Sequence, residues 1–131
     1  MAATFAVVDD DPASQRMLSD ILNTRGDVVA EFSSGGEALK FFESGQRIDV
    51  CFIDLLMPDI SGIEVVEIAI SLHPMTLFVM VSQVEAKTLL ADAYAAGIEF
   101  FIHKPINRNE ILGHCRPCFG KTTTEINFGT N

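Results

Sequence analysis

The chain lacks long apolar runs, and this absence excludes one class of protein at once. Hydrophobic residues make up 48% of its 131 residues, yet no apolar stretch approaches the ~18 residues that a membrane-spanning helix needs. Residues 1–5 contain no basic region and no long apolar segment, so we expect no signal peptide. The sequence therefore predicts a cytoplasmic protein that makes no contact with a membrane.

Basic residues are also scarce. Lysine and arginine number 9 against 18 aspartates and glutamates, which gives a formal net charge of −9 at pH 7. Because contacts with phosphates need a basic patch, we expect no direct nucleic-acid binding by this segment. Ordinary solubility charge explains most of the acidic excess, and a metal site explains part of it.

Cysteine is limited to three positions. Cys51 lies inside an apolar run, where a thiol usually behaves as a small hydrophobic group. Cys115 and Cys118 have the Cys-x-x-Cys spacing of redox motifs, but they follow a helical pattern, whereas redox pairs normally open a helix. We therefore assign them no role.

The remaining pattern alternates strand and helix five times. Predicted strands cover residues 4–8, 28–32, 50–54, 77–81 and 99–103. Predicted helices begin at residues 12, 62 and 86 and near 108, and a further helix follows the turn at residues 33–36. Strands this apolar indicate a parallel sheet that is covered on both faces. We predict an α/β fold, a doubly wound five-stranded parallel sheet of flavodoxin-like order 2-1-3-4-5 with helices on both faces. Residues 1–116 form one domain, and residues 117–131 form a polar tail or the start of a linker.

Polar groups follow four of the five predicted strands. Because parallel strands end at the same edge of a sheet, these groups are expected to lie close together. Crowded carboxylates repel one another, so such a cluster needs a cation. The groups are Asp9, Asp10 and Asp11 after the first strand, Asp54 after the third, Ser82 after the fourth and Lys104 after the fifth.

These residue types suit phosphoryl transfer to a carboxylate. A carboxylate can act as a nucleophile and form an acyl phosphate. Acidic oxygens with an open position suit Mg²⁺, which keeps several waters and binds phosphate oxygens. A lysine and a hydroxyl can hold the remaining phosphoryl oxygens.

Four motifs resemble those of the receiver domain of two-component response regulators, and the resemblance covers roughly residues 4–116. They are residues 7–11 (VVDDD), 53–62 (IDLLMPDISG), 81–82 (VS) and 104–105 (KP). Residues 82–84, 97–102 and 104–107 further resemble the Gram-positive glutamine-utilisation regulators. In that subfamily the receiver precedes a DNA-binding output domain, which lies outside this chain.

The resemblance implies a phospho-acceptor and a metal site. Asp54 matches the aspartate that accepts the phosphoryl group. Asp9 and Asp10 match the acids of the Mg²⁺ site, with Asp10 as a direct ligand and Asp9 acting partly through water. The backbone carbonyl of Leu56 matches a further metal ligand.

The resemblance also implies a switch. Ser82 and Lys104 would contact the phosphoryl group, a cis peptide bond would join Lys104 to Pro105, and Phe101 occupies the position of an aromatic switch residue. The domain would accept a phosphoryl group from a sensor histidine kinase and change its binding to an output domain, with a homodimer possible on phosphorylation. It would catalyse only its own phosphorylation and dephosphorylation.

Other interpretations remain open. Asp11 precedes Pro12 and suits a helix N-cap, Ser82 suits the cap of the fourth helix, and Phe101 suits a plain core position. One alternative function is an aspartyl-phosphate phosphohydrolase. Such enzymes typically need an acid two residues after the nucleophile, where this chain has Leu56. Another is a degenerate receiver that acts independently of phosphorylation.

Two apolar residues depart from the family pattern near the acceptor. Leu56 and Val84 occupy positions that influence attack by water on the phosphoryl group. Because neither side chain can orient a hydrolytic water, we expect slow self-dephosphorylation.

Overall fold

The computed structural model describes residues 3–85 and 87–113. The strands are β1 (Ala3–Val8), β2 (Gly26–Phe32), β3 (Val50–Ile53), β4 (Leu77–Ser82) and β5 (Phe100–His103). The helices are α1 (Pro12–Leu22), α2 (Gly35–Glu43), α3 (Gly62–Leu72), α4 (Lys87–Ala96) and α5 (Arg108–Gly113). Over these ranges, no helix has the length and apolar character needed to span a membrane. The predicted boundary at residue 116, the tail, and the pair Cys115 and Cys118 lie outside the described residues.

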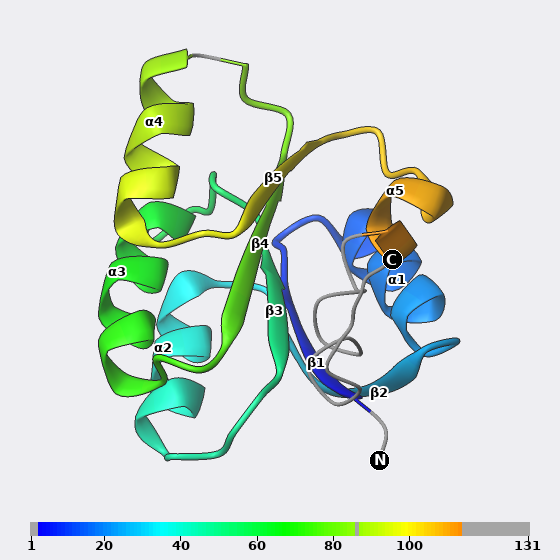
Figure 1. Ribbon diagram of the computed structural model, residues 1–131, viewed down its shortest axis with the longest axis horizontal. Coiled ribbons are helices and arrows are strands. Elements are labelled where there is room, and N and C mark those ends of the chain that lie inside the picture. Colours follow the sequence, from blue (N-terminus) through cyan, green and yellow to red (C-terminus); the bar gives the residue numbers. More distant parts are fainter. Residues whose placement is uncertain (1–2, 86, 114–131) are drawn as a thin grey trace, which may run out of the picture.

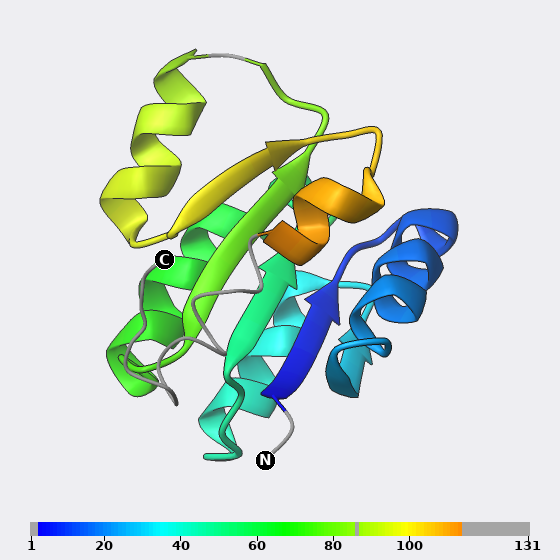
Figure 2. The same ribbon diagram turned by 45° about the vertical axis from the view of Figure 1, so that its right-hand side comes forward.

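The five strands form one parallel sheet in the order β2-β1-β3-β4-β5, which confirms the predicted topology. Helices α1 and α5 cover one face, and α2, α3 and α4 cover the other (Figure 1). Figure 2 shows β1, β3, β4 and β5 side by side with their arrowheads toward the same edge. All the groups that follow these strands therefore reach one edge of the sheet.

Alternating strand residues divide the core into two layers. On β1, Phe5 and Val7 belong to the layer under α1 and α5, whereas Ala6 and Val8 belong to the layer under α2, α3 and α4. The four residues of β3 are all fully buried, since the sheet is covered on both sides. Packing on both faces fixes the ends of the central strands, which is where the polar groups follow.

Helix caps fix where the connections turn. Asp11 is the N-cap of α1 and accepts a hydrogen bond from the backbone of Ser14, as predicted. Ser61 and Glu64 form a capping box at the start of α3. Ser82 is not a helix cap, because α4 begins five residues later at Lys87.

Strand β2 begins two residues earlier than predicted, at Gly26. Gly26 lies before the predicted strand, but it pairs with Ala3 in the sheet. A Cβ at position 26 would lie 2.3 Å from the carbonyl oxygen of Ala3. The glycine therefore permits a close approach of two strands, which a periodicity of side chains does not reveal.

Candidate functional site

Three site residues stand one position beyond a strand and extend its ladder by one backbone hydrogen bond to the neighbouring strand. This shared geometry fixes their backbones before any side chain is considered. The bonds run from Asp9 N to Phe32 O (3.0 Å), from Asp54 N to Val8 O (2.9 Å) and from Lys104 N to Ser82 O (2.9 Å).

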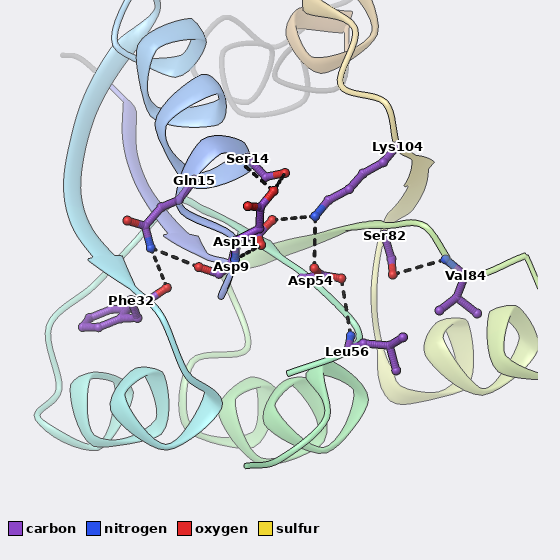
Figure 3. Close-up of polar contacts among 10 residues, drawn as sticks. All are labelled: Asp9, Asp11, Ser14, Gln15, Phe32, Asp54, Leu56, Ser82, Val84 and Lys104. Atoms are coloured by element: carbon purple, nitrogen blue, oxygen red, sulfur yellow. Dashed lines mark hydrogen bonds and ion pairs between the residues drawn. The ribbon is translucent and has the colours of Figure 1, made fainter. Parts of the chain in front are cut away.

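Lys104 bridges two of the acids. Its Nζ lies 3.0 Å from Asp9 Oδ2 and 3.1 Å from Asp54 Oδ2 (Figure 3). Burial lowers the pKa of Lys104, but the hydrogen bonds and charges of the two carboxylates outweigh it, so the pKa lies above its usual value. The lysine therefore stays protonated at neutral pH, and its charge partly neutralises both carboxylates.

Asp9 is almost completely buried, with 1% of its side chain exposed. Its backbone N donates to Phe32 O, its backbone O accepts from Gln15, and its Oδ1 accepts from Asp11 N at 2.9 Å. Oδ2 forms no hydrogen bond within the described residues and has only the ion pair with Lys104. Burial is the main cause that raises the pKa of Asp9.

The acids fit a hard divalent cation. Asp9, Asp10 and Asp54 each offer one carboxylate oxygen, and these oxygens lie within 4.8 Å of one another. Asp10 is exposed, so the cluster opens to solvent on one side. Within the described residues, the cluster thus offers a buried oxygen without a hydrogen bond next to two further carboxylates, and such oxygen ligands suit Mg²⁺.

Asp54 lies at the start of the β3–α3 loop. Its Oδ1 accepts a 3.4 Å hydrogen bond from Leu56 N, while Oδ2 contacts Lys104. Leu56 is 57% exposed beside this carboxylate. A partner that reaches Asp54 from solvent therefore meets an apolar side chain at the rim.

The same loop is tied closely to α2 and α3. Gly62 N donates to Leu55 O at 2.7 Å, and a Cβ on Gly62 would lie 2.2 Å from the backbone oxygen of Asp54. Asp59 accepts from the backbone of Gly35 and Gly36 at 3.1 and 2.8 Å. These hydrogen bonds, above all the one from Gly36, lower the pKa of Asp59.

Ser82, Phe101 and Pro105 complete the predicted set. Ser82 is buried at the end of β4, and its Oγ accepts a 3.4 Å hydrogen bond from Val84 N (Figure 3). The half-buried ring of Phe101 packs against the core layer under α2, α3 and α4, with its centroid 5.0 Å from that of His103. The peptide bond between Lys104 and Pro105 is cis, the isomer expected from the sequence.

The structure brings the four strand-end groups to one edge, as the sequence suggested, and adds two residues that sequence reasoning missed. Gln15 hydrogen-bonds the loop that carries Asp9 and Asp10. Asp59, in the loop that carries Asp54, accepts hydrogen bonds from the start of α2. Asp59 lies inside a recognised motif, which was its only signal. Gln15 belongs to no motif, and its partner Phe32 is 17 residues away, so no local pattern indicates the contact.

Comparison with known proteins agrees with this geometry. Residues 5–116 match the family described as the response regulator receiver domain. The transcriptional regulatory protein GlnL of Bacillus subtilis (strain 168) is 40% identical over 110 residues, which cover 82% of this chain and 35% of GlnL. This likeness is consistent with the predicted subfamily. The chain thus spans about a third of the length of that relative.

Shorter relatives and solved structures are similar over most of their length. The chemotaxis protein CheY of Bacillus subtilis (strain 168) is 29% identical over 113 residues, which cover 86% of this chain and 93% of CheY. The crystal structure of a CheY-like receiver domain protein from Methanospirillum hungatei superposes with a TM-score of 0.83 at 26% identity, covering 89% of this chain and 93% of the other. With its strand order, its strand-end acids and this match over residues 5–116, the chain belongs to the response regulator receiver domain family.

Proposed function

We propose that this receiver domain is a phosphorylation-dependent switch in which Asp54 accepts the phosphoryl group. One observation carries the proposal: the Asp54 carboxylate contacts the Lys104 ammonium within a cluster whose other acids, Asp9 and Asp10, place an oxygen within 4.8 Å of it. A nucleophile, a cation and a metal-binding donor set thus occupy one edge of the sheet.

The transfer step follows from these groups. A carboxylate oxygen of Asp54 attacks the phosphorus of a phosphohistidine on the partner kinase. The phosphorus–nitrogen bond breaks, its electron pair returns to the imidazole, and an acyl phosphate forms on Asp54. Lys104 offsets charge on the phosphoryl oxygens. Mg²⁺ held by Asp9, Asp10 and the Leu56 carbonyl would supply further neutralisation of those oxygens.

The phosphorylated state would then alter binding to a partner. Ser82 ends β4 and Lys104 directly follows the adjacent strand β5, so both can be drawn toward new phosphoryl oxygens. Movement of Ser82 would bias a two-state equilibrium of the surface formed by α4, β5 and α5, where Phe101 occupies the position of the family's aromatic switch residue. We propose a sensor histidine kinase as the donor, an output domain beyond this chain as the responder, homodimerisation as one response, and the cytoplasm as the setting.

Intact-mass spectrometry tests the proposal. The chain is incubated with Mg²⁺ and acetyl phosphate, or with a beryllofluoride mimic, and the wild type is compared with Asp54→Ala. We expect a single adduct on the wild type, dependent on Mg²⁺, and none on the variant. Asp92→Ala, in an exposed position on α4, is the matched control and should be modified like the wild type. An unmodified wild type, or equal modification of Asp54→Ala, contradicts the proposal.

The same experiment separates the alternatives. A phosphohydrolase would release phosphate from a substrate through many turnovers, but Leu56 stands where its acid would be needed. We expect instead that each chain is phosphorylated once, with no turnover of a substrate. A degenerate receiver would form no adduct, whereas here the acids and the lysine are all in place.

A further inference from the structure

The side-chain amide of Gln15, on α1, connects the acidic loop to strand β2. Its Nε2 lies 3.2 Å from the backbone oxygen of Asp9 and 2.8 Å from that of Phe32 (Figure 3). Both partners are carbonyl oxygens, which only accept, so the NH₂ group and not the amide oxygen must face them. One amide group thus uses both of its hydrogens to link two main-chain segments.

This link lies just beyond the last hydrogen bond between β1 and β2. Strand β1 ends at Val8, and the last ladder bond beyond it runs from Asp9 N to Phe32 O. Past that bond the backbone must turn away toward the N-cap of α1 at Asp11. The Gln15 amide binds the Asp9 carbonyl at this turn, and so restrains the peptide that joins Asp9 to Asp10.

That peptide determines how the two acids face each other. The carboxylate of Asp9 is buried and fixed through its Oδ1, whereas Asp10 is exposed and depends on the direction of its backbone. Residues that orient metal ligands from behind typically change metal affinity 10- to 100-fold when they are removed. Gln15 would orient both acids in this way, although it is not itself one of the metal-binding residues.

We propose that Gln15 is a positioning residue for the divalent-cation site, acting through the Asp9–Asp10 peptide. This inference rests on the proposed function, because it presupposes that the acids bind Mg²⁺. It extends that function to a residue of α1 that neither binds metal nor contacts Asp54 within the described hydrogen bonds.

The test measures Mg²⁺ affinity and stability separately on the full chain. Gln15→Met keeps the length of the side chain and removes both donors. Gln46→Met makes the same change in the exposed connection between α2 and β3 and serves as the matched control. Mg²⁺ titration is followed through backbone amide resonances by NMR at a temperature where each variant is folded, and urea unfolding gives stability.

We expect Gln15→Met to bind Mg²⁺ about tenfold more weakly, with the amide resonances of Asp10 and Asp11 displaced before metal is added, and Gln46→Met to match the wild type. Gln15→Ala is prepared in parallel in case the methionine variant does not fold, with the same expected loss. Unchanged affinity in a folded Gln15 variant, even with lowered stability, overturns the inference and leaves the proposed function intact. A wild type that binds no Mg²⁺ overturns both.

Discussion

The ammonium of Lys104 lies 3.0 Å from Asp9 Oδ2, the oxygen of Asp9 that accepts no hydrogen bond from a backbone amide of the described residues. In this arrangement the lysine serves as the cation of the acid cluster. A divalent cation bound by the same acids would compete for that oxygen and release the lysine from it. The ammonium also lies 3.1 Å from Asp54 Oδ2. Once released from Asp9, it would be available to a phosphoryl group on Asp54.

The first prediction concerns the cost of the buried Asp9 charge. Burial raises the pKa of Asp9 above 3.8, so the folded state disfavours its charged form. Asp9→Asn should therefore raise the Tm of the metal-free domain at pH 7. A gain of about 1 kcal/mol corresponds to roughly 3–6 °C in a domain of this size. Thermal unfolding followed by circular dichroism measures it.

The stability gained by Asp9→Asn should depend on pH. The penalty for a charged Asp9 is complete above its raised folded pKa and disappears as the pH falls toward 3.8, the value of the unfolded chain. The advantage of Asp9→Asn should shrink on acidification over that range, and an advantage that grows would contradict the burial argument. Mg²⁺ should stabilise the wild type and leave the variant unaffected.

The second prediction concerns the lifetime of the acyl phosphate. Leu56 is exposed beside Asp54, and Val84 is half-buried next to Ser82. Neither side chain can orient a water for attack, so the wild-type acyl phosphate should be long-lived. Leu56→Asn introduces a polar group at the rim and should shorten the half-life about tenfold, a modest effect for a group that orients a reactant.

Phosphate loss from the isolated phosphorylated chain is followed by intact mass over time. Leu72→Asn, which makes the same change at an exposed position of α3, is the control and should keep the wild-type half-life. A wild type that loses its phosphoryl group as fast as Leu56→Asn would show that Leu56 does not protect it.

The strand-end groups were predictable because their signal is local. A short apolar run followed by Asp54 or by Lys104 indicates both the strand and its polar end, and the parallel topology brings those ends together. The capping box of Ser61 and Glu64 was predictable for the same reason, since its partners are three residues apart.

The supporting contacts were not predictable, because they join residues that are distant in the chain. Gln15 reaches Phe32 across 17 residues, and Asp59 reaches Gly35 across 24. A glutamine within an amphipathic helix has no periodic signal that distinguishes it from a solvated one. Gly26 lies outside the predicted strand, and only the pairing with Ala3 shows its place in the sheet.

The third prediction concerns Gly62, where the chain passes close to the acceptor. A Cβ there would lie 2.2 Å from the backbone oxygen of Asp54, so Gly62→Ala must displace the β3–α3 loop. We expect a loss of about 2 kcal/mol in the free energy of unfolding, typical of overpacking at a tight contact, together with slower phosphorylation of Asp54. Urea unfolding and intact-mass kinetics measure the two effects.

Gly113→Ala is the matched control, because a Cβ on Gly113 meets no atom of the described residues within 4 Å. This variant should retain both the stability and the phosphorylation rate of the wild type. Equal behaviour of the two alanine variants would show that the close approach at Gly62 does not constrain the loop.

The fourth prediction concerns Asp59, whose carboxylate joins the acceptor loop to the start of α2. Its pKa is lowered from 3.8 chiefly by the hydrogen bond from Gly36 N, so the charged form stabilises the fold. That contribution is complete above 3.8, where both states are ionised, and is lost as the pH falls through the lowered folded pKa. Asp59→Asn should therefore lower the Tm at pH 7, and its deficit should narrow below pH 3.8. Asp92→Asn, on the exposed surface of α4, should show neither effect. A deficit in Tm that persists unchanged in acid would mean that the charge of Asp59 does not contribute to the stability of the contact between this loop and α2.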